Sequence, residues 1–197
     1  MKAIIHIVKT LRQGGVIAFP TETIYGLGVD IFNEKAVNKL YQLKGRDFNK
    51  PLSIFVSSLK MLENYVEEIP PQAKELIQKY WAGPLTLVFK ASSKVPKFVL
   101  AGGNTIGIRM SSHKIINQIV ERLGHPMTAT SANTSGKKEA LTADEVRQYF
   151  PSGLDYIIED SAQENTITGN IASTVVDISQ HDIRILREGT ISQALAV

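Results

Sequence analysis

The sequence predicts a single α/β domain, in which helices pack on a twisted, mixed β-sheet. Two observations predict this class. Helical and extended hydrophobic patterns alternate along the whole chain, with no repeat, low-complexity tract or linker between them. Hydrophobic residues make up 43% of the 197 residues, which is enough to bury a sizeable core without disulfides or metals. We therefore expect one domain that covers residues 1–197.

Five segments have the apolar spacing of amphipathic helices. Gly14 and Gly15 follow the first segment and are typical of a helix C-terminus. Asn33 is a suitable N-cap for the second segment, and Pro71 falls in the first turn of the third. The predicted helices cover 3–13, 34–43 and 71–80, a stretch after Ser112, and a short segment behind the capping box of Thr142 and Glu145.

Short apolar runs between these helices predict the strands. They cover 16–19, 52–56, 85–91, 105–110, 127–130, 156–159, 173–179 and 182–186. Ligand-binding loops of α/β proteins usually lie just beyond strand ends, and the polar clusters of this chain fall at such positions.

Cysteine is absent from the sequence. This absence excludes disulfides, zinc–thiolate sites and cysteine nucleophiles, and it suits a reducing compartment. Lys9 and Arg12 interrupt the apolar N-terminal segment, no signal-peptide cleavage site follows it, and no stretch approaches membrane-spanning length. We therefore expect a cytoplasmic protein that does not contact membranes.

The charges are unevenly distributed along the chain. Residues 1–60 hold nine Lys or Arg against four Asp or Glu, and residues 86–138 hold eight against one. If these two stretches fold together, they form a basic, concave surface suited to phosphates. The alternative is that these cations are ordinary solvated surface residues. Residues 139–164 hold one basic residue against seven acidic ones, and we expect this stretch to face solvent rather than a nucleotide.

Two clusters near the N-terminus are candidates for ligand binding. Residues 20–28, PTETIYGLG, form a predicted loop that is denser in hydroxyl and carboxylate groups than a turn requires. Lys44, Arg46 and Lys50 lie within seven residues and are separated by Gly and Asp-Phe-Asn, a spacing that fits a phosphate clamp. The helix macrodipole alone would explain a cation at Lys44.

Further candidates lie in the second half of the chain. Arg109 ends an apolar strand and is either a surface terminus or a carboxylate anchor. Residues 128–136, TATSANTSG, offer hydroxyls and backbone N–H groups that can bind phosphate, although an ordinary Ser/Thr-rich loop would look similar. Ser173 begins one predicted strand and Arg187 ends another, so both could face the same site.

Several common signatures do not occur. The chain has neither a phosphate-binding G-x-x-x-x-G-K-[ST] loop nor a dinucleotide-binding G-x-G-x-x-G motif. It also lacks a G-x-S-x-G elbow, and its four histidines do not have metal-ligand spacing. The aromatic residues do not form an RNA-stacking pattern.

Taken together, the motifs resemble those of a known family. The chain contains, in order, PTETIYGLG (20–28), KGR and KPLS (44–53), AGPLT (82–86), TIGIR (105–109), TSANTSG (130–136), STVVD (173–177) and ILREG (185–189). This combination resembles the YrdC/TsaC family of threonylcarbamoyl-AMP synthases in its short, single-domain form. The resemblance implies a YrdC-like fold and the synthesis of threonylcarbamoyl-AMP from L-threonine, bicarbonate or CO2, and ATP, with release of pyrophosphate. The product would serve the t6A modification at position 37 of tRNAs that read codons beginning with A.

The resemblance also implies roles for single residues. It implies ATP binding by Lys44, Arg46, Lys50, Thr105, Ser131, Asn133 and Arg187. It implies threonine binding by Thr23, Arg109, Ala129 and Ser173. No side chain is implied as a covalent catalyst or a metal ligand: Lys44 and Arg46 would contribute by neutralising charge, and Mg²⁺ would enter with ATP. Phe55 stands where many relatives carry histidine, and Glu139 lies in a segment that resembles a mobile lid.

The implied macromolecular partners are tRNA or double-stranded RNA and, transiently, other proteins of t6A synthesis. Two alternatives remain open. One is a carbamoyl-adenylate-forming enzyme of hydrogenase maturation, a family that carries this domain within a much longer chain. The other is a non-catalytic module that binds double-stranded RNA or tRNA, which the basic stretches would permit.

Overall fold

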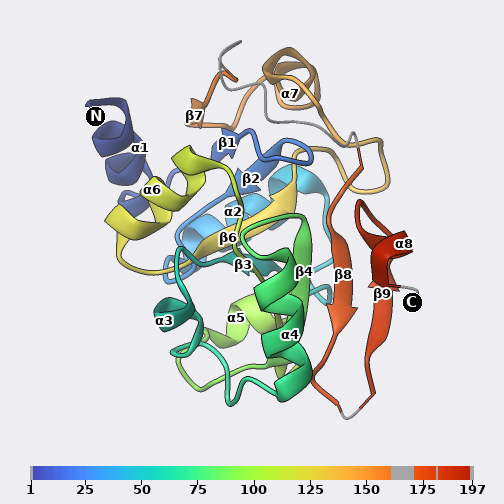
Figure 1. The fold of residues 1–197 in the computed structure, drawn as a ribbon. Helices are drawn as coiled ribbons and strands as arrows, with labels where there is room; N and C mark the ends of the chain where they lie inside the picture. The colour runs from blue at the N-terminus through green and yellow to red at the C-terminus, as the bar shows by residue number, and fades with distance from the viewer. Residues whose placement is uncertain (1, 161–170, 181, 196–197) are drawn as a thin grey trace.

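The structure is a computed structural model that describes residues 2–160, 171–180 and 182–195. One mixed sheet runs through the molecule, with its strands in the order β7-β1-β2-β6-β3-β5-β4-β8-β9 (Figure 1). The pairs β1–β7, β3–β5 and β4–β8 are parallel, and the other neighbouring pairs are antiparallel. The predicted class, an α/β domain with a mixed sheet, is confirmed.

All eight predicted strands occur, and their ends agree with the prediction to within two residues. The strands of the sheet are β1 (Ile17–Phe19), β2 (Gly26–Gly28), β3 (Ser53–Phe55), β4 (Leu85–Lys90), β5 (Thr105–Arg109), β6 (Met127–Ser131), β7 (Tyr156–Ile157), β8 (Thr174–Asp177) and β9 (Arg184–Arg187).

Strand β2 corrects the prediction that residues 20–28 form a loop. Its Gly-Leu-Gly sequence does not predict a strand, because glycine weakens strands. The glycines are required by the packing of Phe19. A Cβ atom on Gly26 would lie 2.6 Å from Cε2 of Phe19, and one on Gly28 would lie 2.8 Å from Cε1. The Phe19 ring therefore lies directly against the β2 backbone, which only glycine permits.

The five predicted helices occur as well. Asn33 Oδ1 accepts from Ala36 N at 3.1 Å, and Thr142 Oγ1 accepts from Glu145 N at 3.1 Å, so both predicted N-caps are confirmed. Three further helices of one turn are too short to produce a hydrophobic period. The helices are α1 (Lys2–Arg12), α2 (Glu34–Lys44), α3 (Leu59–Leu62), α4 (Pro71–Tyr80), α5 (Lys97–Leu100), α6 (Lys114–Leu123), α7 (Ala143–Tyr149) and α8 (Ser192–Leu195).

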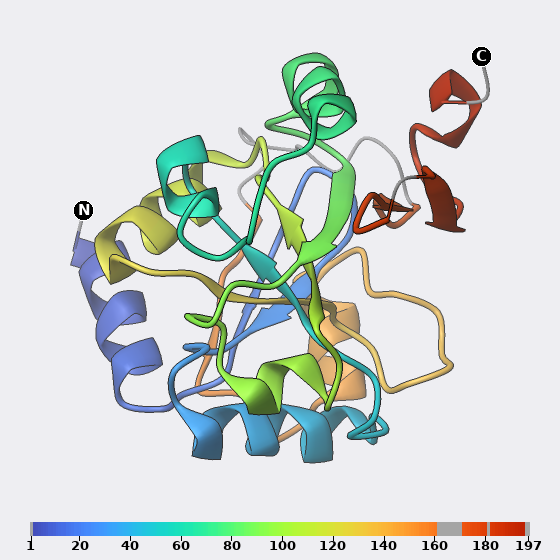
Figure 2. The ribbon, with the colours of Figure 1, turned by 90° about the horizontal axis from the view of Figure 1, so that it is seen from below.

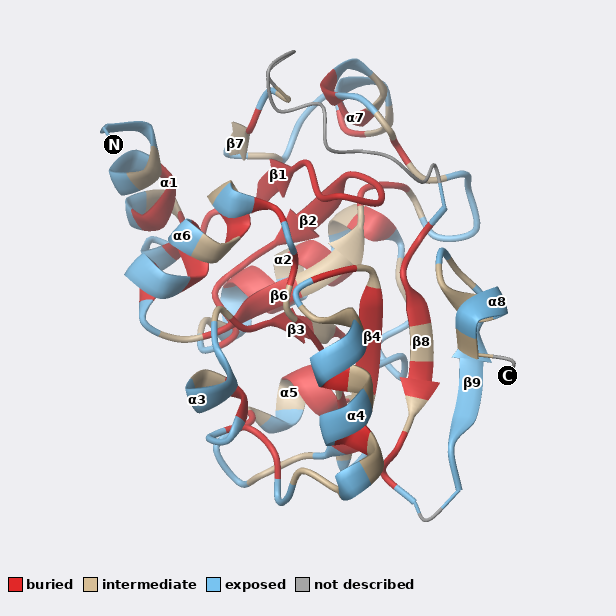
Figure 3. Ribbon diagram, in the orientation of Figure 1, coloured by how far each residue is buried: buried red, intermediate tan, exposed pale blue. Residues whose placement is uncertain are grey.

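The helices cover the sheet in groups. Helices α1 and α6 lie side by side, as do α2 and α5 (Figure 2). The apolar faces of α1 and α6 form a small core with Phe19 and Phe55, and the other helices bury a larger one. Figure 3 shows that β1, β2 and β4 are buried, whereas the edge strand β9 is exposed. None of the helices in the described ranges combines the length and the apolar character that crossing a bilayer requires.

Candidate functional site

A pocket lies over the central strands of the sheet. Side chains from the loop before β2, from the segment after α2, and from β3, β4, β5, β6, β8 and β9 line it. Six of the predicted site residues are among these: Arg46, Arg109, Ala129, Ser131, Ser173 and Arg187. Three arginines that are far apart in the sequence thus meet in one basic, concave site.

Arg109 ends β5, and its guanidinium is held by protein groups. Its Nε donates to Gly83 O at 3.1 Å, and its Nη2 donates to Thr23 Oγ1 at 3.1 Å. Nη2 also forms an ion pair with Glu22 Oε1 at 2.9 Å. The Arg109 side chain is buried, with 7% of its surface exposed. The Phe55 ring lies beneath, 5.8 Å from the guanidinium carbon. Arg109 is therefore a buried cation in the pocket wall rather than a surface terminus.

Glu22 is a site residue to which the sequence analysis assigns no role. Its carboxylate accepts hydrogen bonds from Ser111 Oγ and, at 3.2 Å, from Ser112 N. Burial alone would raise the pKa of Glu22, but the charge of Arg109 and the hydrogen bond from Ser111 outweigh burial and lower this pKa below its ordinary value. Glu22 thus stays ionised and cancels the charge of Arg109. Its place inside the polar PTET cluster is the sequence signal that could have revealed it.

Thr23 lies behind Arg109 and is fully buried. The Thr21 hydroxyl donates to Ile24 O at 2.7 Å, so the contact of 2.9 Å between Thr21 and Thr23 is donated by Thr23. The proton of the Thr23 hydroxyl therefore points toward Thr21, and a lone pair receives the hydrogen bond from Arg109.

Arg187 reaches inward from the exposed strand β9 to Ser173. Its Nη2 donates to Ser173 O at 2.7 Å and to Ser173 Oγ at 3.0 Å, and Ser173 Oγ lies 2.9 Å from Thr86 Oγ1. Partial burial lowers the pKa of Arg187, and so do the positive charges of Arg109 and Arg46. Arg109 and Arg46 therefore both repel Arg187 across the pocket, and an anion bound there would relieve this repulsion.

Lys44 is a buried cation beneath the pocket, with 2% of its surface exposed. Its Nζ donates to Ser131 O, to Asn133 O at 2.7 Å and to Asn133 Oδ1 at 3.2 Å. Asn133 Oδ1 also accepts from Ser131 Oγ at 2.7 Å. Burial, and then the positive charge of Arg46, lower the pKa of Lys44 to about 7. Lys44 and Asn133 thus fix the end of β6, where Ser131 lines the pocket.

Five predicted site residues do not line the pocket: Thr23, Lys44 and Asn133, described above, and Lys50 and Thr105. Lys50 is exposed, and its carbonyl accepts from Arg46 Nε at 3.3 Å and from Tyr41 Oη at 2.8 Å. Thr105 begins β5, at the opposite end of the strand from Arg109, and pairs with Lys90. The backbone carbonyl of Lys50 therefore helps to place the Arg46 guanidinium. Thr105 is separated from Arg109 by the length of β5.

The acidic stretch 139–164 corrects another expectation in part. Asp144 and Glu159 are exposed and pair with Arg147, as expected for a solvated surface. Glu139, however, is half-buried, and its negative charge partly opposes the lowering of the pKa of both Lys44 and Arg187. Glu139 therefore acts on the basic site at a distance. Residues 161–164 of this stretch lie outside the described residues.

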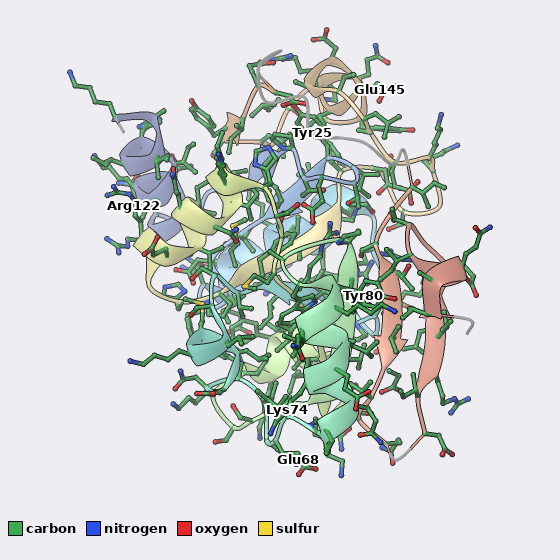
Figure 4. The ribbon with its side chains drawn as sticks, in the orientation of Figure 1. Tyr25, Glu68, Lys74, Tyr80, Arg122 and Glu145 are labelled. Carbon is green, nitrogen blue, oxygen red and sulfur yellow. The ribbon has the colours of Figure 1, made fainter. Side chains whose placement is uncertain are left out.

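Tyr25 is a pocket residue that the sequence analysis does not single out. Its hydroxyl donates to Ile158 O at 3.1 Å and accepts from Asp160 N at 3.0 Å, and burial raises the pKa of Tyr25 to about 12. Figure 4 shows Tyr25 in the interior near β1 and β2. Tyr80, in the same view, reaches from α4 to the C-terminal segment, where its hydroxyl donates to Ala194 O at 3.1 Å.

Gly107 makes room for two side chains that line the pocket, Ser53 and Thr86. A Cβ atom on Gly107 would come 2.6 Å from Ser53 Oγ and 3.4 Å from Thr86 Cγ2. We expect Gly107→Ala to lower the free energy of unfolding by about 1–3 kcal/mol, because overpacking forces a neighbour to shift. Urea denaturation measures this loss.

The double variant Gly107→Ala/Ser53→Ala is the control for this prediction. Removing the Ser53 hydroxyl removes the closest clash, so the double variant should recover most of the lost stability. A Gly107→Ala variant as stable as the wild type would contradict the packing argument.

Among the described residues, no group of three or more His, Cys, Asp or Glu side chains could hold a metal ion. The polar groups that line the pocket are instead arginines and hydroxyls, with one buried carboxylate, Glu22, paired with Arg109. Such a set binds small anions and zwitterions by hydrogen bonds and charge.

Comparisons with known proteins identify the family of this chain. The model of the Sua5/YciO/YrdC family, described as telomere recombination, matches residues 9–189. A threonylcarbamoyl-AMP synthase of Pyrococcus abyssi is 38% identical over 179 residues, which are 91% of this chain and 52% of the relative. A threonylcarbamoyl-AMP synthase of Halorhodospira halophila is 37% identical over 153 residues, which are 78% of this chain and 80% of that relative.

Solved structures give the same result. The crystal structure of P. abyssi Sua5 complexed with L-threonine superposes with a TM-score of 0.88 at 36% identity, and the alignment covers 94% of this chain and 54% of that one. The chain thus spans about half the length of the Pyrococcus relative and four fifths of the Halorhodospira relative. Because the family model covers nearly the whole sequence, the chain belongs to the Sua5/YciO/YrdC family.

Proposed function

We propose that this chain is a threonylcarbamoyl-AMP synthase, a nucleotidyltransferase that joins L-threonine, bicarbonate or CO2, and ATP and releases pyrophosphate. Its product would serve the t6A modification at position 37 of tRNAs that read codons beginning with A. The convergence of Arg46, Arg109 and Arg187 on one pocket carries the proposal, because both the carbamate and the triphosphate are anions that repel each other. The names of the relatives support the same activity.

The reaction needs positioning and charge neutralisation rather than a protein nucleophile. The threonine amine adds to CO2 and loses a proton to form a carbamate. An oxygen of the carbamate attacks the α-phosphorus of ATP, the bond from this phosphorus to the bridging oxygen breaks, and pyrophosphate leaves. Holding the two anions together against their repulsion lowers this barrier, as in other phosphoryl transfers. Mg²⁺ belongs to the substrate, since it enters bound to the triphosphate.

The residues divide between the two substrates in this proposal. The two N–H groups of Arg109 Nη1 bind the threonine carboxylate, and Ser173 and Ala129, which also line the pocket, contact the same substrate. Arg46, Ser131 and Arg187 bind ATP, assisted by Lys50 and Thr105 from outside the pocket wall. Thr23, Lys44 and Asn133 support the groups that line it.

Pyrophosphate release tests the proposed function directly. The purified protein is incubated with ATP, bicarbonate and L-threonine, and we expect release that depends on all three. Serine replaces threonine in the control reaction and should support much less release. Mass spectrometry of the mixture should detect the threonylcarbamoyl adenylate. RNA binding that falls steeply with salt, together with no pyrophosphate release, would instead indicate a non-catalytic RNA-binding module.

Contacts with tRNA, transient contacts with other proteins of t6A synthesis and a cytoplasmic location remain predictions. The same assay bears on them only indirectly, because it needs neither RNA nor a second protein.

A further inference from the structure

The cations of the pocket differ in their electrical surroundings. The guanidinium of Arg109 has a buried counter-charge, the Glu22 carboxylate, at 2.9 Å. Within the described residues, neither Arg46 nor Arg187 has a carboxylate at ion-pair distance, and Glu139 acts on Arg187 only from farther away. The Arg109 part of the pocket is thus close to neutral, whereas the part with Arg46 and Arg187 is positive.

The two proposed substrates differ in the same way. Threonine enters as a zwitterion without net charge, whereas ATP carries a highly charged triphosphate. A phosphate group is drawn to wherever positive charge is in excess, and a buried arginine without a counter-charge would be a strong phosphate site. Without Glu22, Arg109 would be such a site, and phosphates would compete with threonine for it.

We propose that Glu22 is a specificity-determining residue that cancels the charge of Arg109 and so keeps phosphate groups out of the threonine-binding part of the pocket. This inference rests on the proposed function. Glu22 does not line the pocket itself, and it acts through Arg109 and through its field. The phosphates are then left to Arg46 and Arg187.

The hydrogen bonds show that Glu22 can do this without blocking threonine. The three N–H groups of Arg109 Nε and Nη2 donate to Gly83 O, Thr23 Oγ1 and the Glu22 carboxylate. The two N–H groups of Nη1 have no acceptor within the described part of the chain. A ligand carboxylate can therefore bind Nη1, while Ser111 and Ser112 hold the Glu22 carboxylate against Nη2.

The test replaces Glu22 with glutamine, which has nearly the same shape but no charge. Calorimetry measures threonine binding to the wild type and to Glu22→Gln at rising concentrations of inorganic phosphate. We expect phosphate to raise the apparent Kd for threonine less than about twofold in the wild type and roughly tenfold or more in Glu22→Gln, since uncancelled charge in a buried site attracts anions strongly. If phosphate raises the apparent Kd for threonine no more in Glu22→Gln than in the wild type, the proposal is overturned.

Two further variants sharpen the test. Glu139→Gln removes a negative charge that acts on Lys44 and Arg187 but has no contact with Arg109, so its threonine binding should resist phosphate as the wild type does. Glu22→Met is a second neutral variant and should be sensitive to phosphate, like Glu22→Gln. If circular dichroism shows that neither neutral variant folds, Glu22 has a structural role and the proposal is wrong.

The outcome also separates this inference from the proposed function. A wild-type protein that binds no threonine would contradict the proposed function. A wild type that binds threonine, next to a Glu22→Gln variant with the same phosphate dependence, would contradict only the role of Glu22.

Discussion

Arg109→Ala is expected to lose most of its threonine binding and to keep most of its ATP binding. Gly83, Thr23 and Glu22 fix the guanidinium of this side chain and leave Nη1 for a ligand. Truncating one partner of a buried, hydrogen-bonded charge pair costs about 2–5 kcal/mol of binding. Calorimetry with each ligand separately measures the effect. An equal loss of affinity for threonine and ATP would contradict the assignment of Arg109 to threonine.

The same variant is expected to be less stable, for a reason unrelated to threonine. Without Arg109, the Glu22 carboxylate is buried without a cation, and breaking a buried pair in this way costs about 3–5 kcal/mol. In the wild type, the lowered pKa of Glu22 contributes stability that is present above its unfolded-state pKa and is lost as the pH falls through the folded-state pKa. In Arg109→Ala, burial dominates and raises this pKa, so the variant should lose most stability at neutral pH and less in acid.

The double variant Arg109→Ala/Glu22→Gln separates the two effects. Removing the stranded charge should restore much of the stability at neutral pH, as urea denaturation would show. It should not restore threonine binding, because the guanidinium is still missing. Recovery of threonine binding in the double variant would mean that Arg109→Ala acts by unfolding the site.

The sequence predicts the strands other than β2 well, because strand formation depends on local apolar patterns, and it singles out three arginines that line the pocket. Arg109 ends an apolar strand and Arg187 ends the last one. Because β5 and β9 run in the same direction in the sheet, both residues lie at the same edge. Arg46 follows a helix whose C-cap, Gly45, adopts the left-handed conformation that the Lys-Gly-Arg sequence favours. The convergence of the three arginines follows from these local features and a mixed sheet.

The sequence does not reveal features that depend on contacts between distant residues. The Gly-Leu-Gly segment of β2 becomes a strand by pairing with β1 and β6, and its glycines leave room for the Phe19 ring. Glu22 is recognisable as a counter-charge only once Arg109 and Ser111, almost ninety positions away, lie beside it. Glu139 belongs to a stretch that is otherwise solvated, and only the folded chain brings its charge near Lys44.

Lys44→Met is expected to weaken ATP binding and to remove a pH dependence of stability. The ammonium of Lys44 supplies three donors to Ser131 and Asn133, and methionine supplies none. Buried carbonyls without donors cost about 1–3 kcal/mol each. The end of β6 should therefore loosen, and Ser131 should lose its place in the pocket. Calorimetry with ATP and urea denaturation measure the two losses.

The pH dependence distinguishes the charge of Lys44 from its packing. The pKa of Lys44 is about 7 in the folded chain, below the ordinary 10.5 of the unfolded chain, so the unfolded state binds more protons between these values. Wild-type stability should therefore rise with pH in this range, by about 2 kcal/mol between pH 7 and 9 relative to Lys44→Met. If the difference in the free energy of unfolding between the two proteins does not change with pH, the pKa of Lys44 is not lowered in the folded chain.

ATP binding should reverse this neutralisation. Phosphates bound beside Arg46 and Ser131 bring negative charge close to Lys44, and an opposite charge raises the pKa of a lysine. Wild-type protein should therefore take up a fraction of a proton when it binds ATP at pH 7.5, whereas Lys44→Met should take up less. Calorimetry in two buffers of different ionisation enthalpy measures the difference. Equal proton uptake by both proteins would show that Lys44 keeps one protonation state, and that ATP does not act on its charge.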